Sequence, residues 1–116
     1  MFDKALEIDP NYAYAWHNKG SALNNLVKYK EAIKSFDKAL ELNPNDANAW
    51  YNRASSKIKL GNIKDGLSNL KKAIEIDKNN IELAKEDKDF ESIRNDERFK
   101  DLIMKLKKYT TCQMEE

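Results

Sequence analysis

The sequence predicts an all-α protein built from stacked antiparallel helix pairs, and three observations support this fold class. The chain repeats itself every 34 residues, an interval that separates Trp16 from Trp50 and Pro10 from Pro44. Apolar residues recur at helical spacing within each period. The 116 residues include only 3 Gly and 2 Pro, which is too few for the many turns of an all-β fold.

The first period contains two helical patterns. One apolar stripe has steps of four, three and four residues and predicts a helix over 13–26; it consists of Trp16, Gly20, Leu23 and Val27. A second stripe predicts a helix over 29–42 and consists of Ala32, Ile33, Phe36, Ala39 and Leu40. The polar residues around 24–28 lie between the two stripes, where the chain must reverse.

The boundary between the two periods is marked by Asn43-Pro44-Asn45-Asp46. Proline disfavours helical geometry in the residue before it, and Asn45 or Asp46 can cap the amides of the next helix. Equivalent reasoning predicts the remaining helices over 2–9, 47–60, 63–76, 81–90 and 97–108.

This pattern resembles the tetratricopeptide repeat. The residues that carry the resemblance are Trp16, Gly20, Leu23, Ala32, Phe36, Ala39 and Pro44, followed by Trp50, Ala54, Gly66, Leu70 and Ala73. The resemblance implies a right-handed α-solenoid in which the small residues lie where two helices meet and the large ones fill the space between them. Four residues depart from the family pattern, namely Lys19, Arg53, Lys57 and Lys78; lysine stems can still cover apolar surface while the ammonium reaches water.

The predicted organisation is a half repeat at 1–12, complete repeats at 13–46 and 47–80, a degenerate repeat with a C-terminal capping helix at 81–109, and a frayed tail at 110–116. Residues 2–11 match residues 36–45 at 8 of 10 positions, which identifies them as a second helix. The capping helix has one apolar face, formed by Phe99, Leu102, Ile103 and Leu106. Asn95 or Asp96 is the expected N-cap of this helix.

The half repeat leaves Phe2, Ala5 and Leu6 without the first helix that would normally cover them. We favour the interpretation that the chain is cut from a longer array, because terminal repeats normally carry a polar face. The other interpretation is that Phe2 and Leu6 recruit a second copy of the chain and form a homodimer through the N-terminal end.

The residues predict no enzyme, cofactor or metal site. His17 is the single histidine and Cys112 the single cysteine, so neither a nucleophile–base pair nor a zinc site is supported. Asp87, Asp89 and Glu91 alternate like the start of a calcium loop, but the glycine required there is Ser92. A net charge of +1 argues against nucleic-acid and membrane-surface binding. With no signal peptide or long apolar run, we expect a cytoplasmic protein.

The resemblance implies that the first helix of each repeat lines a concave groove that binds a peptide. The inward residues are predicted to be Tyr14, His17, Asn18, Ser21, Asn24 and Asn25 in the first repeat, and Asn48, Tyr51, Asn52, Ser55, Ile58 and Lys59 in the second. Asn18 and Asn52 occupy equivalent positions, where an amide can donate to and accept from a peptide backbone, and tyrosines accompany them. The alternative is that these asparagines merely solvate an exposed helix.

A subtype of the family clamps a C-terminal carboxylate with Lys, Asn and Arg. This chain has His17 and Ser21 at two of those positions, and Glu82 and Glu86 at two others would repel a carboxylate. We therefore expect a protein–protein interaction module that binds a peptide segment of a partner in its groove. The alternative function is a structural array segment that self-associates through its repeat ends.

Overall fold

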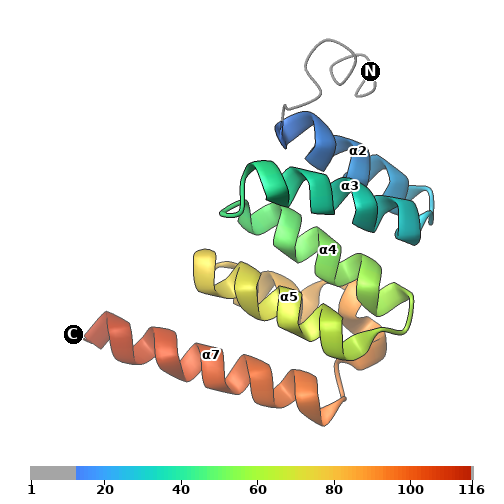
Figure 1. Cartoon of the computed structure of the whole chain (residues 1–116). Helices are drawn as coiled ribbons and strands as arrows, with labels where there is room; N and C mark the ends of the chain where they lie inside the picture. The colour runs from blue at the N-terminus through green and yellow to red at the C-terminus, as the bar shows by residue number, and fades with distance from the viewer. Residues whose placement is uncertain (1–12, 116) are drawn as a thin grey trace.

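The computed structural model describes the backbone of residues 13–115 and the side chains of residues 13–107. The helices are α2 (Ala13–Asn25), α3 (Tyr29–Leu42), α4 (Ala47–Lys59), α5 (Ile63–Ile76), α6 (Asn80–Glu86), a short 3₁₀-helix η1 (Lys88–Ile93) and α7 (Glu97–Glu115). They stack one after another along a single axis (Figure 1). No strand occurs within residues 13–115. The predicted all-α solenoid of helix pairs is confirmed, as is the capping helix at its end.

Each complete helix pair is closed by the same turn. Val27 has a φ of 63° and Gly61 a φ of 86°, and the two positions are one 34-residue period apart. In the first turn the amide of Lys28 donates to the carbonyl of Leu23, and in the second the amide of Asn62 donates to the corresponding carbonyl of Lys57, both at 2.9 Å. This is the Schellman arrangement, which satisfies carbonyls at a helix end with one left-handed residue.

Two of the predicted N-caps are present. The Asp46 carboxylate accepts a hydrogen bond from the amide of Ala49 at the start of α4, at 3.2 Å. Ahead of α7, Asp96 Oδ1 accepts from the amide of Arg98 at 2.8 Å. Both carboxylates satisfy amides that the helix itself leaves without a partner.

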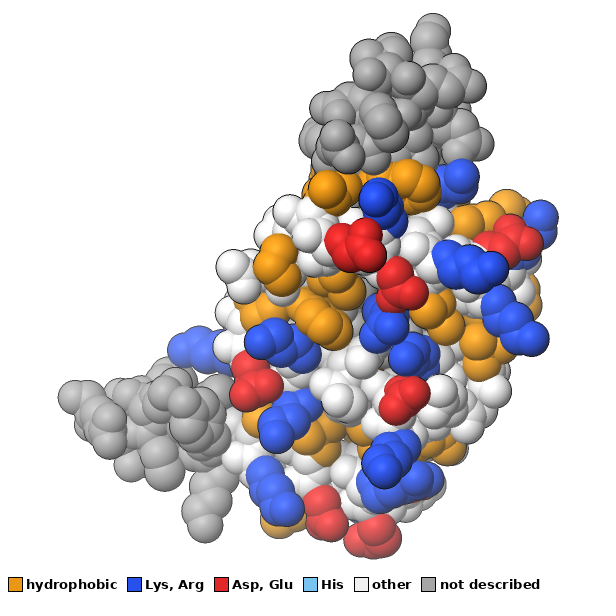
Figure 2. Space-filling model, in the orientation of Figure 1, with side chains coloured by type: hydrophobic (Ala, Val, Ile, Leu, Met, Phe, Trp, Pro, Cys, Tyr) orange, Lys and Arg blue, Asp and Glu red, His pale blue; other side chains and the backbone are white. Residues whose placement is uncertain are grey.

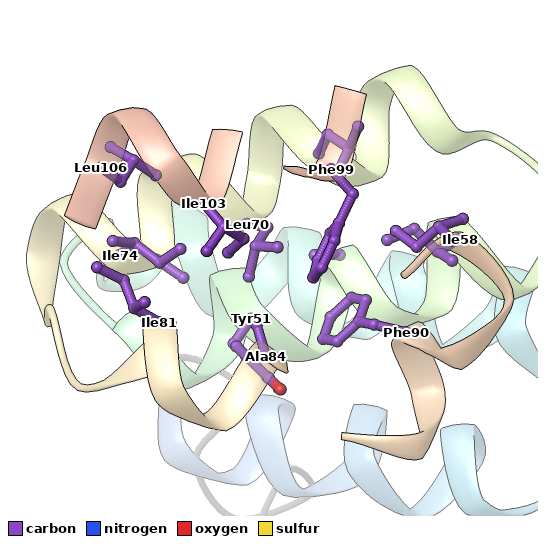
Figure 3. Close-up of a cluster of buried hydrophobic side chains, with 14 residues drawn as sticks. Tyr51, Ile58, Leu70, Ile74, Ile81, Ala84, Phe90, Phe99, Ile103 and Leu106 are labelled. Carbon is purple, nitrogen blue, oxygen red and sulfur yellow. The ribbon is translucent and has the colours of Figure 1, made fainter. Parts of the chain in front are cut away.

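Buried apolar side chains form two clusters along the solenoid. The cluster of the first repeat contains Ala32, Phe36, Leu40 and Ala49. The second cluster extends from α4 to α7 and is organised around Tyr51, Leu70, Ile74, Phe90, Phe99 and Ile103 (Figure 3). Trp50 packs against both clusters and therefore links the two repeats.

Two predicted boundaries are wrong. The helix predicted over 81–90 ends at Glu86, and the chain continues as η1 after an extended Asp87. The break occurs because the Asp87 side chain caps η1, accepting a hydrogen bond from the amide of Asp89. The last helix, predicted over 97–108, continues as α7 to Glu115.

The departures from the family pattern are accommodated by polar partners. Arg53 Nε lies 2.7 Å from Asp37 Oδ1, and its Nη1 donates to Asn69 Oδ1 at 2.6 Å. The Lys57 ammonium lies 3.6 Å from Asp65. Lys19 Nζ lies 5.7 Å from the ring centre of Trp16, so its charge faces the indole.

Other expectations fall on residues that are not described. The half repeat at 1–12 lies outside the described residues, and so do Phe2 and Leu6, on which the expectation of a homodimer depends. Among the helices of residues 13–115, none combines the length and the apolar character needed to cross a bilayer.

Candidate peptide-binding face

The first helices of the two repeats, α2 and α4, present one face that we call the first-helix face. In the first repeat the residues predicted to line it are Tyr14, His17, Asn18, Ser21 and Asn25, and in the second they are Asn48, Tyr51, Asn52, Ser55 and Lys59. Side-chain hydrogen bonds between α2 and α4 set the spacing of this face, and the segment that follows α6 covers one end of it.

His17 belongs to the contact between helices more than to the open surface. Its Nδ1 lies 2.9 Å from Asp46 Oδ2, and its ring meets that of Phe36 edge-on at 5.9 Å. On the other side of the ring, Nε2 lies 3.4 Å from Asn52 Nδ2. Only 12% of the His17 side chain is exposed. The histidine therefore holds α2 against α4 and is poorly placed to contact a ligand.

Asn52 and Asn24 also connect the two first helices. The amide nitrogen of Asn52 donates to Ser21 Oγ at 3.4 Å as well as approaching His17. Close by, the buried Ser56 hydroxyl donates to Asn24 Oδ1 at 2.8 Å. These bonds fix the register of α4 against α2, so part of the predicted asparagine ladder has a structural role.

The α2 end of the first-helix face is open to solvent. Tyr14 is 62% exposed, and its ring stacks on that of His17 at 6.4 Å. Asn25 and Asn48 are exposed, while Asn18 and Ser21 are half-exposed. One exposed aromatic ring thus lies among amide and hydroxyl groups that can both donate and accept hydrogen bonds.

The α4 end of the face is buried, which corrects the prediction for Tyr51, Ser55 and Ile58. These three side chains are 5%, 1% and 4% exposed. The segment formed by Asp87 and η1 is hydrogen-bonded to Tyr51 and Ser55, whereas Ile58 packs toward Gly66 of α5. We call residues 87–93 the docked segment. The expectation of an open groove here came from the tetratricopeptide resemblance, and residues 81–90 were predicted to form a helix rather than to cover α4.

Hydrogen bonds hold the docked segment on α4. The Tyr51 hydroxyl donates to Asp87 Oδ2 and the Ser55 hydroxyl donates to Asp89 Oδ2, each at 2.7 Å. The exposed Lys59 ammonium lies 3.8 Å from Asp89 Oδ1. Burial, the hydrogen bond to Asp87 and the negative charges of Asp87 and Asp89 raise the pKa of the Tyr51 hydroxyl well above its usual range. The hydroxyl therefore stays a proton donor.

An aromatic side chain anchors the same segment. Phe90 is fully buried, with its ring edge-on to Tyr51 at 5.3 Å and stacked near Phe99 at 6.3 Å (Figure 3). Arg94 Nη2 donates to the backbone oxygen of Asp87 at 2.7 Å. Asp87, Asp89 and Phe90 shape the α4 end of the face, and the sequence analysis did not predict this role. The sequence did contain a signal for this arrangement. Phe90 stands among charged residues and does not continue the apolar stripe of the helix before it.

The first-helix face offers mainly hydrogen-bonding groups. No group of three or more His, Cys, Asp and Glu side chains within the described residues could hold a metal ion. The groups that the face does offer are hydroxyls, amides, one exposed aromatic ring and the Lys59 ammonium, which is paired with Asp89. Such groups suit a peptide, whose backbone alternates donors and acceptors.

Comparisons with known proteins agree with this architecture. A tetratricopeptide-repeat family model matches residues 13–46, and a second tetratricopeptide-repeat model matches residues 35–67. A search of curated proteins gave no significant match.

Three solved structures show the same fold. The MamA RS-1 ArsTM double mutant is 24% identical with a TM-score of 0.70, over 94% of this chain and 64% of that one. A crystal structure of MamA is 23% identical with a TM-score of 0.68, over 95% and 67%. The type III secretion translocator chaperone SycD of Yersinia enterocolitica is 16% identical with a TM-score of 0.62, over 94% and 76%. The chain thus spans just under two thirds of the first of these proteins.

Proposed function

We propose that this chain, which is a tetratricopeptide-repeat protein, is a protein-interaction module that holds a peptide segment of a partner on its first-helix face. The segment would lie against the open α2 end of that face. The residues that we expect to contact it are Tyr14, Asn18, Ser21, Asn25 and Asn48. This set is narrower than the predicted groove because the chain itself occupies the α4 end.

The docked segment is the observation that carries this proposal. On α4, hydroxyls at positions 51 and 55 bind a stretch of the same chain through its side chains. The positions one period earlier on α2 are His17 and Ser21, and no described residue outside α2–α4 is hydrogen-bonded to them. The same face thus binds a chain segment at its α4 end, while residues 60–107 place no comparable segment on its α2 end.

The character of the open end indicates the kind of peptide. Tyr14 offers a large apolar surface with few rotatable bonds, which is typical of residues that dominate binding energy. Asn18, Asn25 and Asn48 can pair with the amides and carbonyls of a peptide backbone. None of the proposed contact residues carries a charge, so we expect a partner segment that is polar or neutral.

The proposal of a protein partner agrees with the name of one structurally similar protein. SycD, which shares this architecture, is a translocator chaperone. Recognition of a C-terminal carboxylate receives no support, because Glu82 and Glu86 are exposed acidic side chains at positions where the clamp of that subtype has cations.

Peptide selection tests the proposal. A display library of random peptides would be selected against the full chain, and binding of the enriched sequences would be measured by fluorescence anisotropy. We expect Tyr14→Ala and Asn48→Ala to weaken binding by about tenfold each, since residues that anchor an interface contribute more than ~1 kcal/mol. The matched controls are Lys30→Ala on α3 and Lys72→Ala on α5, both exposed and away from this face.

Two results would contradict the proposal. One is a selected peptide whose affinity is the same for the parent and for the Tyr14→Ala/Asn48→Ala chain. The other is an equal loss of affinity in the control variants. Circular dichroism of each variant would show that the helices are intact.

A further inference from the structure

A second surface, separate from the first-helix face, lies between α5 and α7. The two helices run side by side in Figure 1, and a cleft of about 730 Å³ lies between them. Leu67 from α5 and Leu102 and Leu106 from α7 form its apolar floor. Volumes of roughly 300–1,000 Å³ with an apolar lining are typical of binding sites in proteins.

The rim of this cleft is positively charged. Lys64 and Lys71 line it from α5, and Lys105 lines it from α7. None of the three ammonium groups makes an ion pair with another described residue. Lys and Arg side chains gather over these helices with hydrophobic side chains between them (Figure 2). A ligand of opposite charge would find cations that form no ion pair with the side chains described at 13–107.

The remaining charged residues of the cleft leave its net charge positive. Arg98 also lines the cleft but is bound to Asp96, with Nη2 2.9 Å from Oδ2. Two carboxylates, Glu75 and Asp101, complete the charged lining. When Asp96 is counted with its partner Arg98, four cations stand against three carboxylates, so the charge around the cleft is +1.

We propose that the α5–α7 cleft binds an acidic amphipathic helix of a partner protein. The cleft spans positions 64 to 75 of α5, which corresponds to about 16 Å and so to roughly three turns of a bound helix. Apolar residues along one side of that helix would cover the three leucines. Carboxylates flanking them would meet Lys64, Lys71 and Lys105. This is the helix-in-groove mode of recognition, with charge setting the choice of partner.

Charge-swapped peptides test this surface directly. The full chain would be titrated with a fluorescent peptide of about three helical turns, with leucines on one face and glutamates beside them. A second peptide would carry lysine in place of every glutamate. We expect the acidic peptide to bind at least about tenfold more tightly, with an affinity that falls as salt is added.

Charge reversal on the protein supplies the decisive comparison. Lys71→Glu/Lys105→Glu should lose the acidic peptide and gain the basic one. The control, Lys30→Glu/Lys72→Glu, makes the same change in net charge outside the cleft and should preserve the parent preference. Equal binding of the two peptides by the parent chain, or an equal effect of both double variants, would overturn the proposal.

Other occupants give different results in the same series. Binding to anionic vesicles that is lost in Lys71→Glu/Lys105→Glu, with no binding of the acidic peptide, would assign the cleft to a membrane surface and refute the proposal. Self-association that is lost in the same variant, again without peptide binding, would assign it to a second copy of the chain. Tyr14→Ala should leave binding of the acidic peptide unchanged, which separates this site from the first-helix face.

Discussion

The close approach of helices in this chain depends on single small residues. A Cβ added at Gly20 would lie 2.6 Å from Cε1 of Phe36, and one added at Gly66 would lie 2.5 Å from Cγ1 of Ile58. Ala39 and Ala73 are fully buried at the corresponding contacts of the second helices. The 34-residue pattern predicted these small residues correctly, because each recurs, or is replaced by another small residue, one period later.

Gly20→Ala should therefore lower the free energy of unfolding. The added methyl group overlaps the fully buried Phe36 ring, which costs about 1–3 kcal/mol and outweighs the gain of up to ~1 kcal/mol in helix propensity. Urea denaturation followed by circular dichroism measures the change. Gly20→Ala/Phe36→Leu should recover part of the loss, because the smaller side chain makes room. An unchanged stability in Gly20→Ala would place Gly20 away from the helix contact.

The free energy of unfolding should depend on pH in the alkaline range because of Tyr51. Its pKa is raised in the folded state, so above about pH 10 the unfolded chain releases a proton that the folded chain keeps. The free energy of unfolding should then fall by about 1.4 kcal/mol per pH unit from this group. Tyr51→Phe should lack that part of the slope, as measured by urea denaturation between neutral and alkaline pH. Identical slopes for both chains would contradict the hydrogen bond to Asp87.

The candidate site was less predictable than the core. The positions of Tyr14, Asn18 and Asn48 on the first-helix face were implied by the tetratricopeptide resemblance. The burial of Tyr51 and Ser55 does not, because it depends on Asp87 and Asp89, which lie more than 30 residues later in the chain. Contacts at that separation leave no periodic signal in a single sequence.

At the scale of whole elements, the predictable helices are the four with regular apolar stripes. The helices α2, α3, α4 and α5 end within one residue of their predicted bounds. The prediction of a helix over 81–90 was wrong because two carboxylates of this segment bind groups on α4 and η1. Asp87 caps η1 and binds Tyr51, and Asp89 binds Ser55, so the chain leaves the helix at Asp87 to make these contacts.

The turn shared by both helix pairs gives a prediction at this scale. Val27 has the same left-handed backbone conformation as Gly61. This conformation suits glycine but costs a β-branched residue about 1–2 kcal/mol. Its side chain is 67% exposed, so Val27→Gly loses little burial and should raise the free energy of unfolding by about 0.5–1 kcal/mol. The reciprocal Gly61→Val should lower it. Thermal denaturation of both variants tests the pair, and a destabilised Val27→Gly chain would show that this turn is not strained.

For the whole molecule, the linear stacking of repeats predicts local responses to core substitutions. The two buried clusters lie at different positions along the solenoid and share few residues. In such an array each unit is stabilised mainly by itself and its neighbours. Damage to one cluster should therefore loosen nearby helices first.

Phe90→Ala tests this locality. Removing a fully buried phenylalanine costs about 3–5 kcal/mol, and the loss should release the docked segment together with α6 and α7. Hydrogen exchange should accelerate within 80–107 while α2 and α3 keep their protection. Phe36→Ala is the matched control and should accelerate exchange in α2 and α3. Equal acceleration along the chain in both variants would show a single cooperative unit.

Trp50 is where these two units meet. It packs against both clusters, and its indole nitrogen donates to the carbonyl oxygen of Pro44 at 2.8 Å, at the junction of the repeats. In one-dimensional statistical models of repeat proteins, a contact of this kind contributes to the nearest-neighbour coupling of the array. Coupling of that kind determines whether two adjacent units melt together or in succession. Trp50 thus contributes to the cooperativity of the chain beside the hydrogen bonds that join α2 to α4, and a smaller side chain there should weaken the coupling between the two units.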